Sequence, residues 1–217
     1  MTGVRLRARP VGASALLVEV DGAADVRILS QEIERRRAAG ALGTVVDVVP
    51  GARTVLLDGV TDPAALARTM LAWELGADRS ESGDPSAAAP VPRSIDVPAA
   101  YDGPDLEGVA ARWGVGVDEA VRLHARVQFV VAFCGFSPGF AYLTGMPDHL
   151  AVPRRATPRD VVPAGSIGLA GAYCGVYPRA SPGGWQLIAR TDLQLWDPGR
   201  TEPALLTPGT GVRFVPS

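Results

Sequence analysis

The chain has 217 residues, of which 47% are hydrophobic, and a formal net charge of −2. This is enough for one large or two small domains with hydrophobic cores, and it gives no overall charge that would attract nucleic acid or an acidic membrane surface. The sequence has no lysine and no asparagine, which excludes a P-loop lysine, a Schiff-base lysine, a biotinyl lysine and a Cys-His-Asn triad.

The sequence contains no run of about 18 apolar residues, so we expect no membrane span. Arginines near the N-terminus are not followed by the apolar stretch of a secretory signal. Two cysteines do not make a disulfide framework. We therefore predict a cytoplasmic protein.

The first third of the chain alternates short apolar runs with helical patterns. We expect strands at Ala15–Val20, Thr44–Val49 and Arg53–Asp58, helices at Ala24–Ala39 and from Asp62 to about Leu75, and an additional strand at Val4–Ala8. Asp62 and Pro63 suit the cap and first turn of the second helix. This order predicts a small α+β domain of the ferredoxin-like kind over residues 1–76.

The segment Gly76–Pro92 is small, polar and rich in proline, and it has no periodicity. We assign residues 77–92 to a linker and residues 93–217 to a second domain.

The second domain begins with a strand at Ser94–Val97, two short helices and a buried strand at Gln128–Phe133. The helices are expected at Asp105–Trp113 and Val117–Arg126. The stretch Gly135–Gly184 then has too many glycines and prolines for a long helix, which indicates short strands in a β-barrel or sandwich.

Arginines outnumber acids in this region. Seven arginines but only two acids, Asp148 and Asp160, lie between residues 120 and 191. Guanidinium groups suit carboxylates and phosphates, so this excess favours an anion site, although scattered surface arginines would give the same count.

A second feature that indicates an anion site is a set of three loops rich in glycine and proline: Cys134–Phe140, Val162–Gly168 and Tyr177–Trp185. Glycine lets the backbone approach a ligand and lets consecutive amides form an anion-binding nest. Each loop taken singly is better explained by a barrel corner or a hairpin turn. Together with the arginines they indicate a shared pocket.

Among other reactive residues, His124 stands at the end of a predicted helix and is a candidate acid or base, whereas His149 suits an exposed turn. Ser137 fits the letters of a nucleophile elbow, but Pro138 removes the amide that an oxyanion hole needs. Cys134 and Cys174 lack metal-ligand spacing, so no metal is predicted.

Three long motifs carry a resemblance to a known family: GFSPGFAYLTG at 135–145, VPRRATPRDVVPAGSIGLAG at 152–171 and GVYPRASPGGWQLIART at 175–191. They resemble the family of the 5-oxoprolinase B component, also labelled allophanate hydrolase subunit 1. That family includes a Bacillus sporulation-kinase inhibitor and part of the carboxyltransferase region of urea carboxylase. The chain departs from the family where Tyr173-Cys174 replaces the usual Gln-Thr.

The resemblance implies an α+β fold, with an N-terminal ferredoxin-like domain followed by a C-terminal cyclophilin-like β-barrel. It implies a hetero-oligomer with the C component of 5-oxoprolinase, which is a second cyclophilin-like protein, and it implies the A component for full activity. ATP with Mg²⁺ is expected at a site shared with or supplied by a partner. The implied reaction opens the 5-oxoproline lactam to glutamate, and the expected substrate is a small anionic amide. Nucleic acid and membrane partners are not expected.

Site residues follow from the motifs together with the chemistry. We assign catalytic roles to His124, Arg154, Arg159 and Ser166. We assign substrate binding to Gly135, Phe136, Pro138, Gly139, Arg179, Ser181, Gly183 and Gly184. In this hypothesis anionic groups are held by Arg154, Arg159 and Arg179. The amides of residues 164–166 stabilise an oxyanion, and His124 moves a proton.

Two other functions remain open at this stage. One is allophanate hydrolysis or carboxyl transfer of the urea carboxylase type. The other is a regulator that binds a histidine kinase. Prolyl isomerase activity, which a cyclophilin-like barrel raises, ranks lower because fold alone does not carry function.

Overall fold

The computed structural model describes residues 4–75 and 93–217, which belong to two compact units. The predicted linker at residues 77–92 lies outside the described residues. Within the described ranges, no helix is long and apolar enough to cross a membrane.

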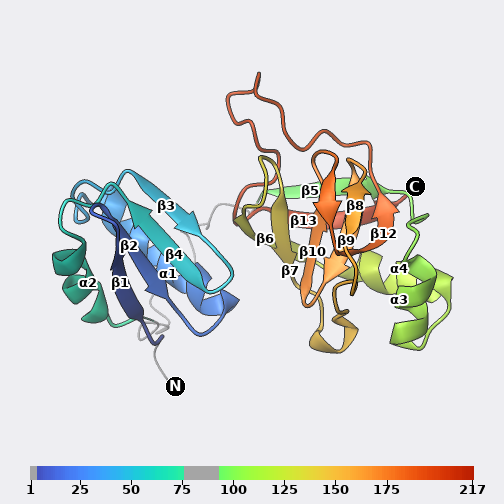
Figure 1. Ribbon diagram of the computed structural model, residues 1–217, viewed down its shortest axis with the longest axis horizontal. Helices are drawn as coiled ribbons and strands as arrows, with labels where there is room; N and C mark the ends of the chain where they lie inside the picture. The colour runs from blue at the N-terminus through green and yellow to red at the C-terminus, as the bar shows by residue number, and fades with distance from the viewer. Residues whose placement is uncertain (1–3, 76–92) are drawn as a thin grey trace, which may run out of the picture. The chain divides into compact units, whose positions relative to one another are not determined.

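The N-terminal unit is an antiparallel four-stranded sheet with two helices packed on one face (Figure 1). The order of the strands across the sheet is β1-β2-β4-β3. Its elements are β1 (Arg7–Val11), β2 (Ala15–Glu19), α1 (Ala23–Ala38), β3 (Asp47–Pro50), β4 (Thr54–Asp58) and α2 (Pro63–Leu71).

The helices form where the sequence pattern indicates. Val26, Leu29 and Ile33 of α1 are buried against the sheet, as their helical spacing requires. At the start of α2, the Asp62 carboxylate accepts a hydrogen bond of 2.9 Å from the Ala65 amide and so caps the helix. The predicted cap is confirmed, and the helix ends at Leu71.

The topology differs from a standard ferredoxin-like unit. In that arrangement a fourth strand follows the second helix and pairs with the first. Among the described residues no strand follows α2 before β5. The edge position beside β2 is instead taken by β1, which precedes it in the chain. The α+β prediction is confirmed, whereas the ferredoxin-like prediction is not confirmed.

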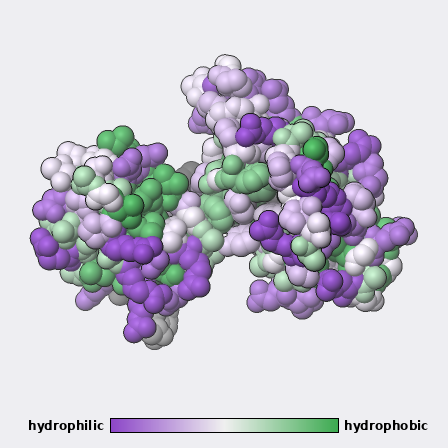
Figure 2. Space-filling view, in the orientation of Figure 1, coloured by the Kyte–Doolittle hydropathy of each residue, from purple (hydrophilic) through white to green (hydrophobic). Residues whose placement is uncertain are grey.

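One face of this sheet carries no helix. Leu17, Leu56 and Val49 form a row across β2, β4 and β3 on the side opposite the core residues Leu16 and Leu57. Figure 2 shows hydrophobic surface gathered over β3 and β4, bordered by hydrophilic side chains.

The C-terminal unit is a seven-stranded sheet that closes on itself. The order is β12-β9-β10-β7-β6-β13-β5, and all neighbours are antiparallel except β13 and β5. Its strands are β5 (Ser94–Ala99), β6 (Phe129–Cys134), β7 (Ala141–Thr144), β9 (Ser166–Ala170), β10 (Tyr173–Val176), β12 (Gln186–Arg190) and β13 (Gly211–Pro216).

A pair of hydrogen bonds joins the two edges of this sheet. Directly after β5, Ala100 exchanges amide-to-carbonyl hydrogen bonds with Arg190 at the end of β12, both of 2.9 Å. The barrel predicted as one of two alternatives is therefore confirmed in this general form, while its cyclophilin-like type stays a prediction.

The barrel is filled by apolar side chains and bordered by helices. Inward-facing residues such as Leu143, Ile167, Leu169, Val176 and Phe214 are fully buried. Helices α3 (Leu106–Trp113) and α4 (Val117–Arg126) pack at one end, and a short 3₁₀ turn, η1 (Asp148–Leu150), follows β7 (Figure 1). A separate two-stranded ribbon pairs β8 (Arg159–Val162) with β11 (Ser181–Gly183).

Two glycines face each other on the outer side of the barrel. Gly168 of β9 and Gly175 of β10 are direct cross-strand partners. A Cβ atom on Gly175 would lie 3.0 Å from the rings of both Phe140 and Trp185, and one on Gly168 would lie 3.1 Å from the Cβ of Trp185. The missing side chains thus leave a hollow in which the two aromatic rings lie against the sheet.

Replacing Gly175 with alanine tests this hollow. We expect Gly175→Ala to lower the free energy of unfolding by about 1–3 kcal/mol, because both rings must move. Urea unfolding measures the change. Gly108→Ala on α3, where nothing lies within 4 Å of the added Cβ, is the control and should be neutral or stabilising. Equal effects of the two substitutions would contradict the packing argument.

Candidate functional site

A cavity of about 550 Å³ lies on the outer face of the barrel, over the hollow made by the glycine pair. It is walled by strands β7, β9 and β10, by the β8–β11 ribbon and by the segment that joins η1 to β8. Its lining residues are Phe136, Phe140, Tyr142, Pro153, Arg154, Ala170, Gly171, Tyr173, Tyr177, Pro182, Gly183 and Trp185.

Aromatic rings make up most of this wall, and they pack edge to face. The Phe140 ring contacts Tyr142, Tyr177 and Trp185 with centroid separations of 5.0–5.5 Å. Such rings present flat apolar surfaces, and the tyrosines add hydroxyl groups that donate or accept hydrogen bonds. Burial raises the pKa of Tyr142, Tyr173 and Tyr177, so these hydroxyls stay protonated near neutral pH.

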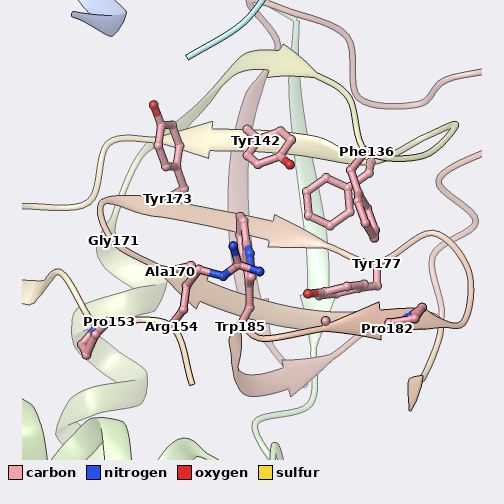
Figure 3. A pocket seen from close by; sticks show the side chains of 12 residues that line it. Phe136, Tyr142, Pro153, Arg154, Ala170, Gly171, Tyr173, Tyr177, Pro182 and Trp185 are labelled. Atoms are coloured by element: carbon pink, nitrogen blue, oxygen red, sulfur yellow. The ribbon is translucent and has the colours of Figure 1, made fainter. Parts of the chain in front are cut away.

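Arg154 supplies the positive charge of the pocket. Its side chain reaches in among the rings from the segment between η1 and β8 (Figure 3). Within residues 4–75 and 93–217, no carboxylate forms an ion pair with it, unlike Arg155 and Arg159. A guanidinium left without such a carboxylate, beside apolar rings, is suited to an anionic group carried on a flat apolar body.

The first glycine-proline loop contributes two side chains to the pocket, those of Phe136 and Phe140. Phe136 lines the cavity, is 61% exposed and has a φ of 67°. Hydrogen bonds from the amides of Gly135 and Phe140 hold the turn closed. Gly139, with φ 82°, lies where a Cβ would clash with Trp196. Gly135, Pro138 and Gly139 therefore shape the turn but do not line the cavity.

The third loop also contributes. Pro182 and Gly183 line the cavity, and a Cβ on Gly183 would lie 2.4 Å from the Tyr177 hydroxyl. The carbonyl of Gly184 accepts a 2.7 Å hydrogen bond from the Arg155 amide. The hydroxyl oxygen of Ser181 is buried and has no partner among the described residues.

The second loop does not donate its amides to a ligand. The amides of Gly165 and Ser166 donate to the carbonyls of Tyr177 and Pro163, at 2.7 and 3.3 Å. Ser166 is only 6% exposed and does not line the cavity. The predicted oxyanion nest at residues 164–166 is therefore wrong for these two amides, because intramolecular bonds already occupy them.

The predicted convergence of three arginines is also wrong. Arg179 is exposed and lies outside the lining of the cavity. Arg159 binds the Asp105 carboxylate with hydrogen bonds of 2.8 and 2.9 Å, and Arg155 binds the same carboxylate at 2.9 Å. Of the three predicted arginines only Arg154 lines the pocket, since Arg159 is bound to Asp105 and Arg179 lies outside the lining.

His124 lies inside the barrel. It is fully buried between Phe129 and Phe214, with Nδ1 2.7 Å from the Tyr101 hydroxyl and Nε2 3.5 Å from the Cys174 sulfur. Desolvation lowers the pKa of His124 to about 3, so the imidazole is neutral near pH 7. It does not line the cavity, and this geometry argues against the predicted role in proton transfer there.

Strand alternation sends the neighbouring side chains of Tyr173 and Cys174 in opposite directions. Tyr173 faces outward and lines the cavity, whereas its neighbour Cys174 faces the barrel core and is fully buried. The side chain at position 173 therefore shapes the pocket wall, and the one at 174 packs in the core next to His124.

A family model described as "Carboxyltransferase domain, subdomain C and D" matches residues 6–206. The chain belongs to this family. The B component of 5-oxoprolinase from Escherichia coli O157:H7 is 43% identical to it over 221 residues, which covers 98% of this chain and 96% of that protein. The resemblance identified from the three motifs is thereby confirmed.

Two solved structures are also similar. The crystal structure of TTHA0988 has a TM-score of 0.73 and 28% identity over 94% of this chain, and the chain spans only 39% of TTHA0988. Kluyveromyces lactis urea carboxylase has a TM-score of 0.67 over 98% of this chain and 22% of its own, and at 19% identity it shows the fold alone.

The burial of His124 predicts an acid-sensitive fold. The unfolded chain takes up a proton on this imidazole near pH 6.5 and the folded chain only near pH 3, so stability is lost as the pH falls below 6.5. We expect the free energy of unfolding to drop by about 2 kcal/mol between pH 8 and pH 5 in urea titrations. His124→Gln removes the titration, so its stability should change less over this range. If the free energies of unfolding of both proteins fell equally with pH, the folded chain would take up the proton on His124 as readily as the unfolded chain, which would contradict this prediction.

The left-handed backbone at Phe136 predicts an unusual response to glycine. A positive φ costs a non-glycine residue about 1–2 kcal/mol, so Phe136→Gly should leave the free energy of unfolding unchanged or raise it. Val161 of β8 is similarly exposed, at 64%, but is not among the residues with positive φ. Val161→Gly should therefore destabilise by about 1 kcal/mol in the same urea assay. A similar loss in both variants would contradict strain at Phe136.

Proposed function

We propose that the chain is one subunit of a multi-component, ATP-dependent 5-oxoprolinase that opens the 5-oxoproline lactam to glutamate. The observation that carries this proposal is the pocket itself: the Arg154 guanidinium, which has no ion pair among the described residues, set among aromatic rings. The identity of 43% with the B component of a 5-oxoprolinase supports the choice of substrate.

The pocket suits 5-oxoproline in size and chemistry. The ligand is a flat five-membered ring with one carboxylate. Its carboxylate would pair with Arg154, its ring would lie against Phe140 and Trp185, and the hydroxyls of Tyr142 and Tyr177 could bond the lactam group. Each contact uses a group that has no competing ion pair among the described residues.

The same pocket does not supply the groups that hydrolysis needs. None of its lining residues is a carboxylate or a histidine, so it offers no general base near neutral pH. We infer that a partner protein provides the base. The chain spans about two fifths of TTHA0988, so in that protein the homologous region is joined to a longer polypeptide, as a partnership would require.

The described residues also do not fit a nucleotide site. Within these ranges no three His, Cys, Asp or Glu side chains gather where they could hold a metal ion, and the sequence has no lysine for the phosphates. We therefore propose that a partner protein binds Mg²⁺-ATP.

The test combines the chain with the C and A components of 5-oxoprolinase and measures ATP hydrolysis that depends on 5-oxoproline. We expect no turnover by the chain alone and turnover by the full set. Arg154→Met should raise the KM for 5-oxoproline at least about tenfold, because the carboxylate loses its charged partner. Arg179→Met, outside the pocket, should change KM less than about twofold. Strong turnover by the isolated chain, or full activity of Arg154→Met, would contradict the proposal.

The family description favours one alternative, carboxyl transfer. A carboxylated donor would also present an anion to Arg154. Assays of the same proteins for carboxyl transfer from carboxybiotin and for allophanate hydrolysis separate the functions. Only the true substrate should be turned over at a rate that falls in Arg154→Met.

A further inference from the structure

Asp105 is the most heavily bonded carboxylate among the described residues, and it lies outside the lining of the pocket. It is 9% exposed and precedes α3. It accepts hydrogen bonds from Arg155 Nη1 at 2.9 Å, from Arg159 Nη2 at 2.8 and 2.9 Å, and from the Leu187 amide at 2.7 Å. One side chain thus joins the start of α3 to β8, to β12 and to the segment that carries Arg154.

The carboxylate remains charged in this position. Burial by itself would raise the pKa of Asp105, but the hydrogen bonds from Arg159 and Leu187 and the two guanidinium charges outweigh burial and lower it. A buried charge that is fully paired holds its partners firmly, because any movement would leave it unpaired.

The segment that presents Arg154 is an irregular strap, residues 151–158, without helix or ladder of its own. On one side of Arg154, Val152 pairs with Gly171 and the Gln186 side chain donates to the Pro153 carbonyl at 3.0 Å. On the other side, the Arg155 amide donates to the Gly184 carbonyl at 2.7 Å. Among the described residues, the only ion pair that anchors the strap to the start of α3 is that of Arg155 with Asp105.

We propose that Asp105 is a positioning residue for the pocket: through Arg155 it fixes the strap, and so sets where the Arg154 guanidinium lies against the aromatic wall. Through Arg159 it also ties down β8, which forms the ribbon beside the pocket. The proposal rests on the proposed function only in treating Arg154 as the anion-binding group. Asp105 itself does not line the cavity.

A ligand-free measurement tests the link directly. Amide hydrogen exchange of Arg155 reports the Gly184 bond, and exchange of Val131, whose amide donates to the Thr210 carbonyl at 2.9 Å, reports the barrel. In the full chain, we expect Asp105→Asn to speed exchange at Arg155 at least about tenfold more than at Val131. Equal acceleration at both amides, or none at Arg155, would overturn the proposal in favour of a general structural role.

A second variant guards against loss of folding. Arg155→Met removes the anchor of the strap but leaves Asp105 bonded to Arg159 and Leu187. It should give the same selective loss of protection at Arg155 with a smaller change in Tm than Asp105→Asn. Retained protection in a folded Arg155→Met protein would show that the ion pair does not hold the strap.

The affinity for 5-oxoproline, measured by calorimetry, gives the functional readout. Asp105→Asn should weaken binding about tenfold, and in an Arg154→Met background it should have no further effect, because it acts through Arg154. Tighter binding in Asp105→Asn, from the two freed guanidinium groups, would overturn the proposal. If the wild-type chain does not bind 5-oxoproline while the exchange result holds, the assigned substrate fails and the positioning role stands.

Discussion

The pocket depends on the absence of two side chains. Gly168 and Gly175 face each other across β9 and β10, and a Cβ on either would press against Trp185, and on Gly175 also against the ring of Phe140. Once those rings are seated, Tyr142 and Tyr177 pack against their edges and the wall is complete. A barrel whose interior is filled mostly by aliphatic side chains thus gains a second, aromatic cluster on its outside.

Charge is arranged around this wall by pairing. Arg154, Arg155 and Arg159 come from one short stretch of sequence, yet among the described residues only the first is left for a ligand. Asp105 forms ion pairs with Arg155 and Arg159 and also accepts a hydrogen bond from the backbone of β12. The pocket lining therefore presents one positive group, the Arg154 guanidinium. We expect it to favour a ligand with one carboxylate over a ligand with several phosphates. Tyr173 of β10 adds another aromatic side chain to the pocket lining.

Local pattern was sufficient to predict much of the fold. The spacing of Val26, Leu29 and Ile33 identified α1, and Asp62 identified the start of α2, because helix burial and capping act within a few residues. The motif segments also pointed to Phe136, Arg154 and Gly183, which do line the cavity. The position of β1 at the sheet edge was harder to predict from the sequence, because a short exposed strand has little hydrophobic alternation.

Long-range pairing is what the sequence could not reveal. The apparent excess of arginine was counted between residues 120 and 191, but its main counterion, Asp105, lies outside that window and about 50 residues from its partners. In the same way, the amide of Gly165 looked available, but it donates to the carbonyl of Tyr177, twelve residues further along the chain. His124 was correctly placed next to a buried strand, yet only the closed barrel shows that it faces Phe129 and Phe214.

The parallel pairing of β5 with β13 has a consequence for the order of folding. In the N-terminal unit β1 pairs with β2 and β3 with β4 across short turns, so much of its sheet can form from neighbouring residues. The barrel instead joins Asp96 to Arg213, 117 positions apart. Bringing such distant segments together is slow. On the ribosome the first unit can mature while the second still waits for β13 to emerge, and until then the exposed flank of β5 is open to unwanted strand pairing.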